Sequence, residues 1–178
     1  MKFTAASIPG VWIIEPDRHM DERGWFARTW CEKEFEAYGL PSRFVQCSAS
    51  FNHRLGTLRG MHYQAAPCQE EKLIRCTRGA MFDVALDLRE ESPMFRQWIG
   101  IELSADNGSA IFIPKGVAHG FQTLLDNTEV HYSITTEFNP SSARTASWND
   151  PAFSIAWPMP EPANISHRDA TAPWLESL

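Results

Sequence analysis

From residue 43 onward, the chain is a succession of short apolar stretches closed by turn residues. Residues 80–87 show the pattern well, because Phe82, Val84 and Leu86 alternate with other positions after Gly79. Strands of about five to eight residues that recur about every eight to twelve residues are typical of an antiparallel sandwich or barrel. The pattern predicts strands over residues 43–50, 71–78, 80–87, 97–103, 109–113, 121–125, 130–137 and 145–148.

Two regions differ from this strand-rich middle. Residues 30–39 have a helical pattern that stops at Gly39 and Pro41, so one short helix is expected there. From Asn149 the sequence is rich in Pro and Trp, and we expect irregular structure that wraps on the sheets.

Length and charge limit the kinds of protein that this chain can be. Its 178 residues, 43% of them hydrophobic, are enough for one domain with a real core, so we expect a single domain over residues 1–178. The net charge of -6 gives no electrostatic footprint for a nucleic acid or an anionic membrane. No apolar run approaches the roughly 18 residues of a membrane span. The first ten residues lack the apolar core of a signal peptide, which favours a cytoplasmic protein.

The four cysteines lie at positions 31, 47, 68 and 76 and form no CxxC pair. Their spacing does not match a zinc knuckle, and the histidines expected beside Cys68 and Cys76 in a metal site are absent. We expect buried, reduced thiols.

Several polar residues lie within or beside strand-like sequence. Arg59, His62 and Gln64 lie in one such stretch, and Lys72 begins another in which it shares a face with Ile74. Inward-facing charged groups would be costly in an apolar core but suit a wet or ligand-filled cavity. Taken singly, each histidine is more simply explained as a structural residue, and Lys72 as a surface lysine.

A metal site is the obvious rival interpretation. Pro114-x-Gly116-x-x-His119 matches the second half of a cupin metal-binding pattern. Gly60 stands where the first half needs a histidine two residues before His62, so we expect no metal.

Motifs spread along most of the chain carry a resemblance to a known family. They are Arg59-Gly60-x-His62-Tyr63-Gln64, Lys72-Leu73, Asp83-Val84, Asp87-Leu88-Arg89, Pro114-x-Gly116-x-Ala118-His119-Gly120-Phe121, Glu129-Val130-x-Tyr132, Trp148-Asn149-Asp150-Pro151 and Ile155-x-Trp157-Pro158. In this order they resemble the dTDP-4-dehydrorhamnose 3,5-epimerases, RmlC-type nucleotide-sugar epimerases of the cupin superfamily, over roughly residues 7–170. The resemblance implies an all-β, cupin-like double-stranded β-helix (an antiparallel jelly-roll sandwich) with a few short helices. It also implies a homodimer without metal or redox cofactor.

The resemblance implies a specific chemistry as well. The substrate is a nucleoside-diphosphate 4-keto-6-deoxyhexose, foremost dTDP-4-dehydro-6-deoxyglucose, whose C3 and C5 protons lie α to the C4 ketone. His62 resembles the base, and Asp169 the carboxylate that orients it. Lys72 would stabilise the enolate oxygen, and Tyr132 would return the proton on the opposite face. The implied pathway is dTDP-rhamnose biosynthesis for cell-surface polysaccharide.

Further residues stand at positions that bind the substrate in the family. They are Arg23, Gln46, Ser48, Arg59, His119, Phe138 and Arg168, and the family suggests that Arg23 comes from the neighbouring subunit. The forked guanidinium of arginine suits a diphosphate. Asp83 remains open between a buried partner of the His and Lys cluster and a solvated acid at a strand end.

The sequence departs from the family at several of these positions. Phe138 stands where a tyrosine is common, which leaves open whether C3, C5 or both carbons are epimerised. The other departures are Arg28 for Glu, Ser48 for Asn, Ala143 for Glu and Arg168 for Lys. Several of these line the nucleotide end in the family, so the base (dTDP, CDP, GDP or UDP) is open too.

Three alternatives to a double epimerase remain. The first is a mono-epimerase, the second is a sugar-nucleotide 3,4-ketoisomerase, and the third is a non-catalytic cupin that binds a sugar. The ketoisomerase family usually lacks the set of Arg59, His62 and Lys72, and a binding protein would not need Tyr132.

Overall fold

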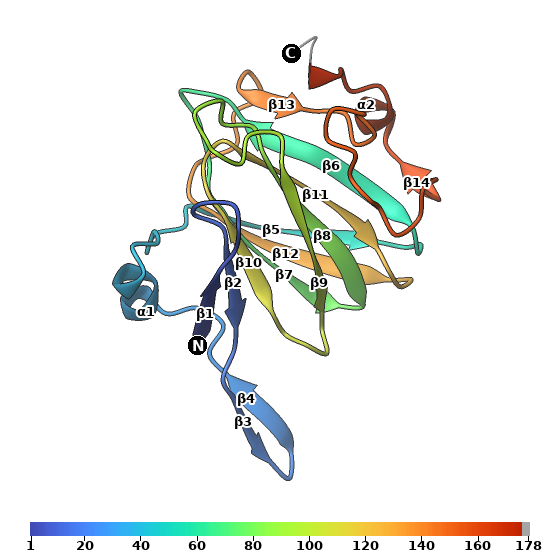
Figure 1. The fold of residues 1–178 in the computed structure, drawn as a ribbon. Coiled ribbons are helices and arrows are strands. Elements are labelled where there is room, and N and C mark those ends of the chain that lie inside the picture. Colours follow the sequence, from blue (N-terminus) through green and yellow to red (C-terminus); the bar gives the residue numbers. More distant parts are fainter. Residues whose placement is uncertain (176–178) are drawn as a thin grey trace.

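The computed structural model describes residues 1–175, so the last three residues of the expected domain, 176–178, lie outside the described part. Two sheets face each other, and their strands pair antiparallel except at one short edge (Figure 1). The first sheet contains, in spatial order, β1 (Lys2–Ala5), β2 (Trp12–Glu15), β10 (Ala110–Ile113), β7 (Lys72–Arg78), β12 (Thr128–Ile134) and β5 (Gln46–Asn52). The all-β sandwich expected from the strand spacing is therefore present.

The second sheet lies opposite and carries the C-terminal part of the chain on its outer face. It contains, in spatial order, β13 (Ala143–Thr145), β6 (Thr57–Gln64), β11 (Val117–Thr123), β8 (Ala80–Asp87) and β9 (Trp98–Ser104). The short strand β14 (Asn164–Ile165) runs parallel beside β6. Two short helices, α1 (Glu32–Ala37) and α2 (His167–Ala170), complete the elements outside the hairpin described below.

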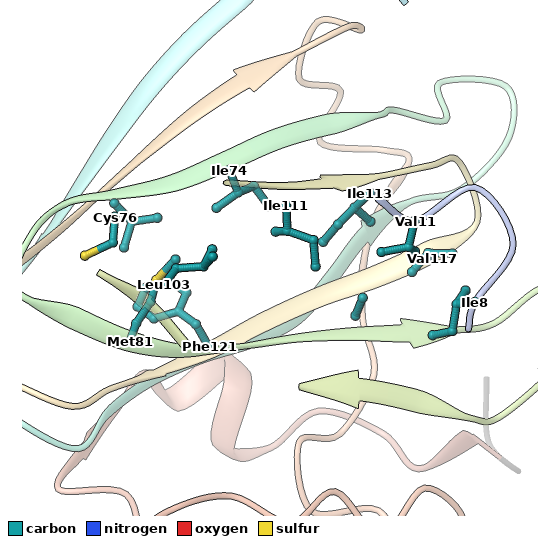
Figure 2. Packing of buried hydrophobic residues seen from close by; sticks show 12 residues of the cluster. Ile8, Val11, Ile74, Cys76, Met81, Leu103, Ile111, Ile113, Val117 and Phe121 are labelled. Atoms are coloured by element: carbon teal, nitrogen blue, oxygen red, sulfur yellow. The ribbon is translucent and has the colours of Figure 1, made fainter. Parts of the chain in front are cut away.

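The main core fills the space between the two sheets (Figure 2). Ile74 and Cys76 reach it from β7, Met81 from β8, and Phe121 from β11, and all four are buried. Because alternate residues of a strand share a face, Lys72 lies on the same side as Ile74 and Cys76, but at the end of the core. The sandwich therefore places Lys72 where the apolar core ends and a cavity, described below, begins.

The outer faces of the sheets are covered as well. Val84 and Leu86 point outward from β8 and pack against the C-terminal tail, where Phe153 and Trp157 are buried. Two tryptophans tie this tail down, because Trp98 Nε1 donates to the carbonyl of Phe153 at 3.1 Å and Trp157 Nε1 donates to that of Trp148 at 2.9 Å. The expected irregular wrapping is thus observed, interrupted only by β14 and α2 within the described residues.

One hairpin does not pack on the sandwich. Strands β3 (Arg18–Asp21) and β4 (Gly24–Ala27) pair only with each other and extend away from both sheets (Figure 1). Its apolar side chains are open to solvent, with Met20 71% and Phe26 75% exposed. Within residues 1–175, Arg18 donates to the carbonyl of Asp106, but Met20 and Phe26 remain largely uncovered.

The strand predictions fail at identifiable places. The expected strands did not include β1–β4, and β6 was expected only as strand-like sequence without bounds, because Gly60 interrupts its alternation. The expected strand at 145–148 is wrong beyond Thr145, because Ser147 turns away and donates its N–H to the carbonyl of Pro173. The helix is also shorter than predicted and covers only Glu32–Ala37.

The cysteine prediction is only partly correct. All four thiols are free, but Cys47 is exposed and only Cys76 is fully buried. Cys47 lies on β5, the edge strand of the first sheet, and no described element covers its side chain. Burial raises the pKa of Cys76 to about 11, which makes that thiol unreactive at neutral pH.

Candidate active site

A cavity of about 300 Å³ lies between the two sheets, beyond the end of the main core. It is lined by Ser48, Ser50, Arg59, His62, Tyr63, Gln64, Glu70, Lys72, His119, Phe121, Tyr132, Ile134, Phe138, Ala143, Arg144 and Arg168. The lining combines aromatic and aliphatic groups with three arginines, one lysine and two histidines, against a single carboxylate among the described residues. Such a charge balance favours an anionic ligand, in a protein that is acidic as a whole.

Two glycines bring the histidines of the cavity side by side. Strands β6 and β11 are paired neighbours, and they lie so close together that a Cβ on Gly60 would be 2.5 Å from the Cα of Gly120. Gly60 also has a φ of +137°, a conformation that other residues rarely adopt. Because His62 and His119 are direct cross-strand partners, their side chains project toward the same hollow.

His62 is held by a carboxylate from the end of the chain. Its Nε2 lies 2.7 Å from Asp169 Oδ1, although the two residues are 107 positions apart. Asp169 sits in α2, where its backbone N–H donates to the side chain of Ser166, and its other oxygen accepts from the N–H of Gly60 at 3.3 Å. The side chain of Asp169 is only 5% exposed, whereas that of His62 is 38% exposed and faces the cavity.

The surroundings of Asp169 keep it ionised. Burial by itself raises the pKa of this carboxyl, but the hydrogen bond and charge of His62, together with the N–H of Gly60, outweigh burial and lower it. Because the folded-state pKa lies below the ordinary value, the stability from this pair is complete above that ordinary value. It is lost as the pH falls through the lower folded-state pKa. The pair is therefore intact at neutral pH.

Tyr132 reaches the cavity from the other sheet. It lies on β12 and its hydroxyl is 3.2 Å from that of Ser50 on β5. Burial raises the pKa of Tyr132 to about 12, with Asp83 adding to the rise and Ser50 and Arg59 opposing it. The phenol thus stays protonated across the neutral range and can donate a proton.

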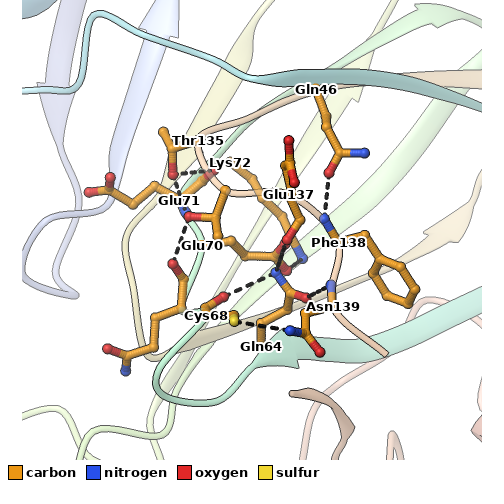
Figure 3. Close-up of polar contacts among 12 residues, drawn as sticks. Gln46, Gln64, Cys68, Glu70, Glu71, Lys72, Thr135, Glu137, Phe138 and Asn139 are labelled. Atoms are coloured by element: carbon orange, nitrogen blue, oxygen red, sulfur yellow. Dashed lines mark hydrogen bonds and ion pairs between the residues drawn. The ribbon is translucent and has the colours of Figure 1, made fainter. Parts of the chain in front are cut away.

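Lys72 is paired inside the cavity with a carboxylate that the sequence did not single out. Its Nζ lies 2.7 Å from Glu70 Oε1, and both side chains are largely buried. Gln64 donates to the other oxygen of Glu70 at 3.1 Å (Figure 3).

Asp83 is buried rather than solvated. Its Oδ2 lies 2.7 Å from Nε2 of His119, and Asp83 is fully shielded from solvent. The alternative of a solvated acid at a strand end is therefore wrong. Asp83 is the partner of His119, and no ion pair joins it to Lys72.

The expected substrate-binding residues divide into two groups. Ser48, Arg59, His119, Phe138 and Arg168 line the cavity. Gln46 stands behind it, where its side-chain oxygen accepts the backbone N–H of Phe138.

Arg23 is not brought to the cavity of its own chain. It lies at the turn of the β3–β4 hairpin, where its side chain is 84% exposed and pairs with Asp21. Sequence position alone could not show this, because the hairpin extends away from the sandwich.

Sequence reasoning missed four of the polar residues that line the cavity. They are Ser50, Tyr63, Glu70 and Arg144. For Glu70 a weak signal existed, because it lies two positions before Lys72, the spacing of residues that share a face of an extended chain. For Arg144 there was none, because β13 is only three residues long.

Two negative observations concern residues 1–175. In this range, no three His, Cys, Asp or Glu side chains are grouped as ligands of a metal ion would be. The helices described there are too short to cross a membrane.

Comparison with known proteins agrees with this architecture. A protein-family model for dTDP-4-dehydrorhamnose 3,5-epimerase matches residues 5–177. The dTDP-4-dehydrorhamnose 3,5-epimerase of Pseudomonas aeruginosa is 44% identical over 170 residues, which is 95% of this chain and 93% of that protein.

Solved structures of such epimerases superpose closely on this chain. The enzyme from Elizabethkingia anophelis has a TM-score of 0.95 at 37% identity, covering 99% of this chain and 97% of its own. The Legionella pneumophila enzyme, solved in complex with dTDP-4-keto-L-rhamnose, has a TM-score of 0.92 at 38% identity, covering 98% and 93%. These similarities confirm the expected cupin-like jelly roll. The chain belongs to the dTDP-4-dehydrorhamnose 3,5-epimerase family.

Proposed function

We propose that this protein is an isomerase that converts dTDP-4-dehydro-6-deoxyglucose to dTDP-4-dehydrorhamnose without a cofactor. The observation that carries the proposal is the presence of His62, Lys72 and Tyr132 around one cavity, with His62 held by Asp169 at 2.7 Å. Each of these groups has one task in proton transfer next to a ketone.

The two sheets supply the two sides of the reaction. His62 comes from β6 of the second sheet and Tyr132 from β12 of the first, so a sugar between the sheets meets them from opposite directions. His62 takes the proton from C3 or C5, and the C–H electrons move into the ketone to form an enolate. Asp169 stabilises the imidazolium that results. Tyr132 then delivers its hydroxyl proton to the other face of the same carbon, which inverts it. Solvent takes the proton from His62 and returns one to Tyr132, so the site is restored and solvent hydrogen enters the product.

Positive groups stabilise the charge that develops. Lys72 lines the cavity, and its ammonium would face the ketone oxygen, where the enolate charge appears in the transition state. Arg59 and Arg168 offer guanidinium groups for the diphosphate, and Arg59 is fixed by its Nε donating to Asn52 at 2.7 Å. A dianionic ligand is thereby accommodated within an acidic protein.

The direct test is to follow the substrate and product by NMR. Incubation with dTDP-4-dehydro-6-deoxyglucose is expected to give dTDP-4-dehydrorhamnose, with C3 and C5 both inverted. The same assay with the CDP-, GDP- and UDP-linked sugars tests the nucleotide, for which we propose dTDP. Migration of the ketone from C4 to C3 would instead identify a ketoisomerase, and an unchanged substrate would identify a binding protein.

The second candidate is a mono-epimerase, and Phe138 is the observation that favours it. Phe138 lines the cavity and is 59% exposed. Replacing it with tyrosine would restore a hydroxyl there. One hydrogen bond is worth about 0.5–1.5 kcal/mol, so if the wild type inverts mainly one carbon, the share of doubly inverted product is expected to rise about two- to tenfold. Phe51→Tyr on β5, outside the cavity lining, is the matched control. An unchanged product ratio in Phe138→Tyr would remove this residue from the explanation.

We further propose a homodimer in which the β3–β4 hairpin contacts the partner. Met20, Trp25 and Phe26 give it an exposed apolar surface, on which Arg18 lies over the ring of Trp25 at 4.4 Å. Arg23 at its turn would then reach the dTDP diphosphate in the cavity of the other subunit.

This arrangement predicts a native mass of about twice the 20.2 kDa of one chain. Phe26→Asp is expected to shift the protein to monomer in analytical ultracentrifugation. Arg23→Ala is expected to keep the dimer but to weaken dTDP binding about tenfold or more, the effect of a charge-assisted hydrogen bond. Arg54→Ala, an exposed arginine outside the cavity lining, serves as the control. Unchanged dTDP affinity in dimeric Arg23→Ala would contradict the proposed contact.

The remaining assignments follow from the same reading. We propose that residues 1–178 form one domain that acts in the cytoplasm, where four free thiols would stay reduced. We also propose that the product serves dTDP-rhamnose biosynthesis for cell-surface polysaccharide, with no nucleic-acid or membrane partner.

A further inference from the structure

Glu70 is the carboxylate that lines the cavity within the described part of the chain. Its Oε1 lies 2.7 Å from Nζ of Lys72, and the side chains of the two residues are 10% and 12% exposed. The proposed mechanism gives Lys72 a task at the ketone oxygen but gives Glu70 none. A largely buried ion pair at the centre of a site calls for a physical account, because removing two charges from water is costly.

Glu70 is itself held in place by a buried amide. Gln64 is 3% exposed, and its Nε2 donates to Glu70 Oε2 at 3.1 Å. The same nitrogen also donates to the carbonyls of Cys68 and Glu137. Oε1 of Gln64 accepts the N–H of Asn139 at 2.6 Å. Figure 3 shows Gln64 at the centre of these bonds, with the Phe138 ring pointing away from them. The carboxylate of Glu70 is therefore oriented at both oxygens.

An oriented carboxylate restricts the ammonium that it binds. A lysine side chain carries about 2 kcal/mol of rotamer entropy, and its ammonium has three N–H donors. The bond to Glu70 uses one donor and leaves two for the ligand. A donor that is fixed before the reaction needs no reorganisation when the enolate charge appears.

We infer that Glu70 is a positioning residue for the reaction, which acts by holding the ammonium of Lys72 at the place where the ketone oxygen binds. The inference rests on the proposed function, because it assigns Glu70 to the same proton-transfer site. Glu70 acts through Lys72 and makes no contact with the reacting carbons.

The test compares Glu70→Ala and Glu70→Gln with the control Glu71→Gln. Glu71 is the neighbouring carboxylate, and only its backbone bonds to Thr135. For each variant, kcat and KM are measured for deuterium uptake from D₂O into the substrate, together with dTDP affinity and the thermal midpoint.

Glu70→Ala is expected to lower kcat about tenfold to a hundredfold, the cost of a misplaced catalytic group, while KM and dTDP affinity stay within about twofold. Glu70→Gln is expected to lose less, because its amide oxygen still accepts from Lys72. Glu71→Gln is expected to match the wild type.

Three outcomes would overturn the inference. One is an unchanged kcat in both Glu70 variants. Another is a rise in KM at constant kcat, which would make Glu70 a substrate contact. The third is a loss of activity in proportion to lost folded protein and lost dTDP binding, which would make its role structural. If Glu70→Ala does not fold, Glu70→Gln decides the question by the same criteria. Wild-type protein that takes up no deuterium would instead refute the proposed function.

Discussion

Replacing His62 with alanine is expected to abolish deuterium incorporation at both C3 and C5 of the substrate. His62 is the only base assigned in the proposed mechanism, and a positioned general base contributes about 10²- to 10⁴-fold to a rate. Both carbons should be affected equally, because one imidazole serves both positions. The measurement is position-resolved NMR of the sugar after incubation in D₂O.

Two controls make this result specific to the base. Binding of dTDP by His62→Ala should stay close to that of the wild type, because the diphosphate is assigned to arginines. His53→Ala changes an exposed histidine that lies outside the cavity lining and should leave exchange unaffected. Exchange in His62→Ala at the wild-type rate would show that the base has been assigned to the wrong residue.

Tyr132→Phe is expected to separate proton removal from inversion. The variant retains His62 and Lys72, so deuterium should still enter the substrate at a substantial fraction of the wild-type rate. Inversion should fall by about 10²- to 10⁴-fold, because the proton donor on the far face is lost. Burial raises the pKa of Tyr132 to about 12, so the wild-type donor remains protonated throughout the neutral range.

The readout for this second variant is the ratio of deuterium uptake to inverted product. Tyr38→Phe provides the control, since Tyr38 stacks on Phe3 at a ring distance of 4.3 Å and lies outside the cavity lining. If uptake and inversion fell by the same factor, Tyr132 could not be the far-face acid.

Periodicity predicted the parts of the fold where burial alternates along one strand. Phe82, Val84 and Leu86 do share a face of β8, and Lys72 does share one with Ile74. The β3–β4 hairpin escaped prediction because its apolar residues are exposed, so they mark no core. The bounds of β6 were not predicted, because Gly60 breaks the alternation where β6 pairs closely with β11.

The candidate site shows the same division between local and long-range information. Pairing of His62 with Asp169 joins residues 107 positions apart, which no local pattern indicates, and only the family resemblance suggested it. The pairs of Asp83 with His119 and of Glu70 with Lys72 depend on how strands and turns meet in space. Neither was predicted from the sequence as a specific contact, although Asp83 was considered a possible buried partner.

Deuterium uptake by the wild-type protein tests the central proposal most directly. The protein is incubated with dTDP-4-dehydro-6-deoxyglucose in D₂O, and the sugar is examined by NMR carbon by carbon. We predict deuterium at both C3 and C5, in a product inverted at both positions. Deuterium at one carbon alone would identify a mono-epimerase. Absence of deuterium from both carbons, in a protein that binds dTDP, would contradict the assignment of this cavity to proton transfer.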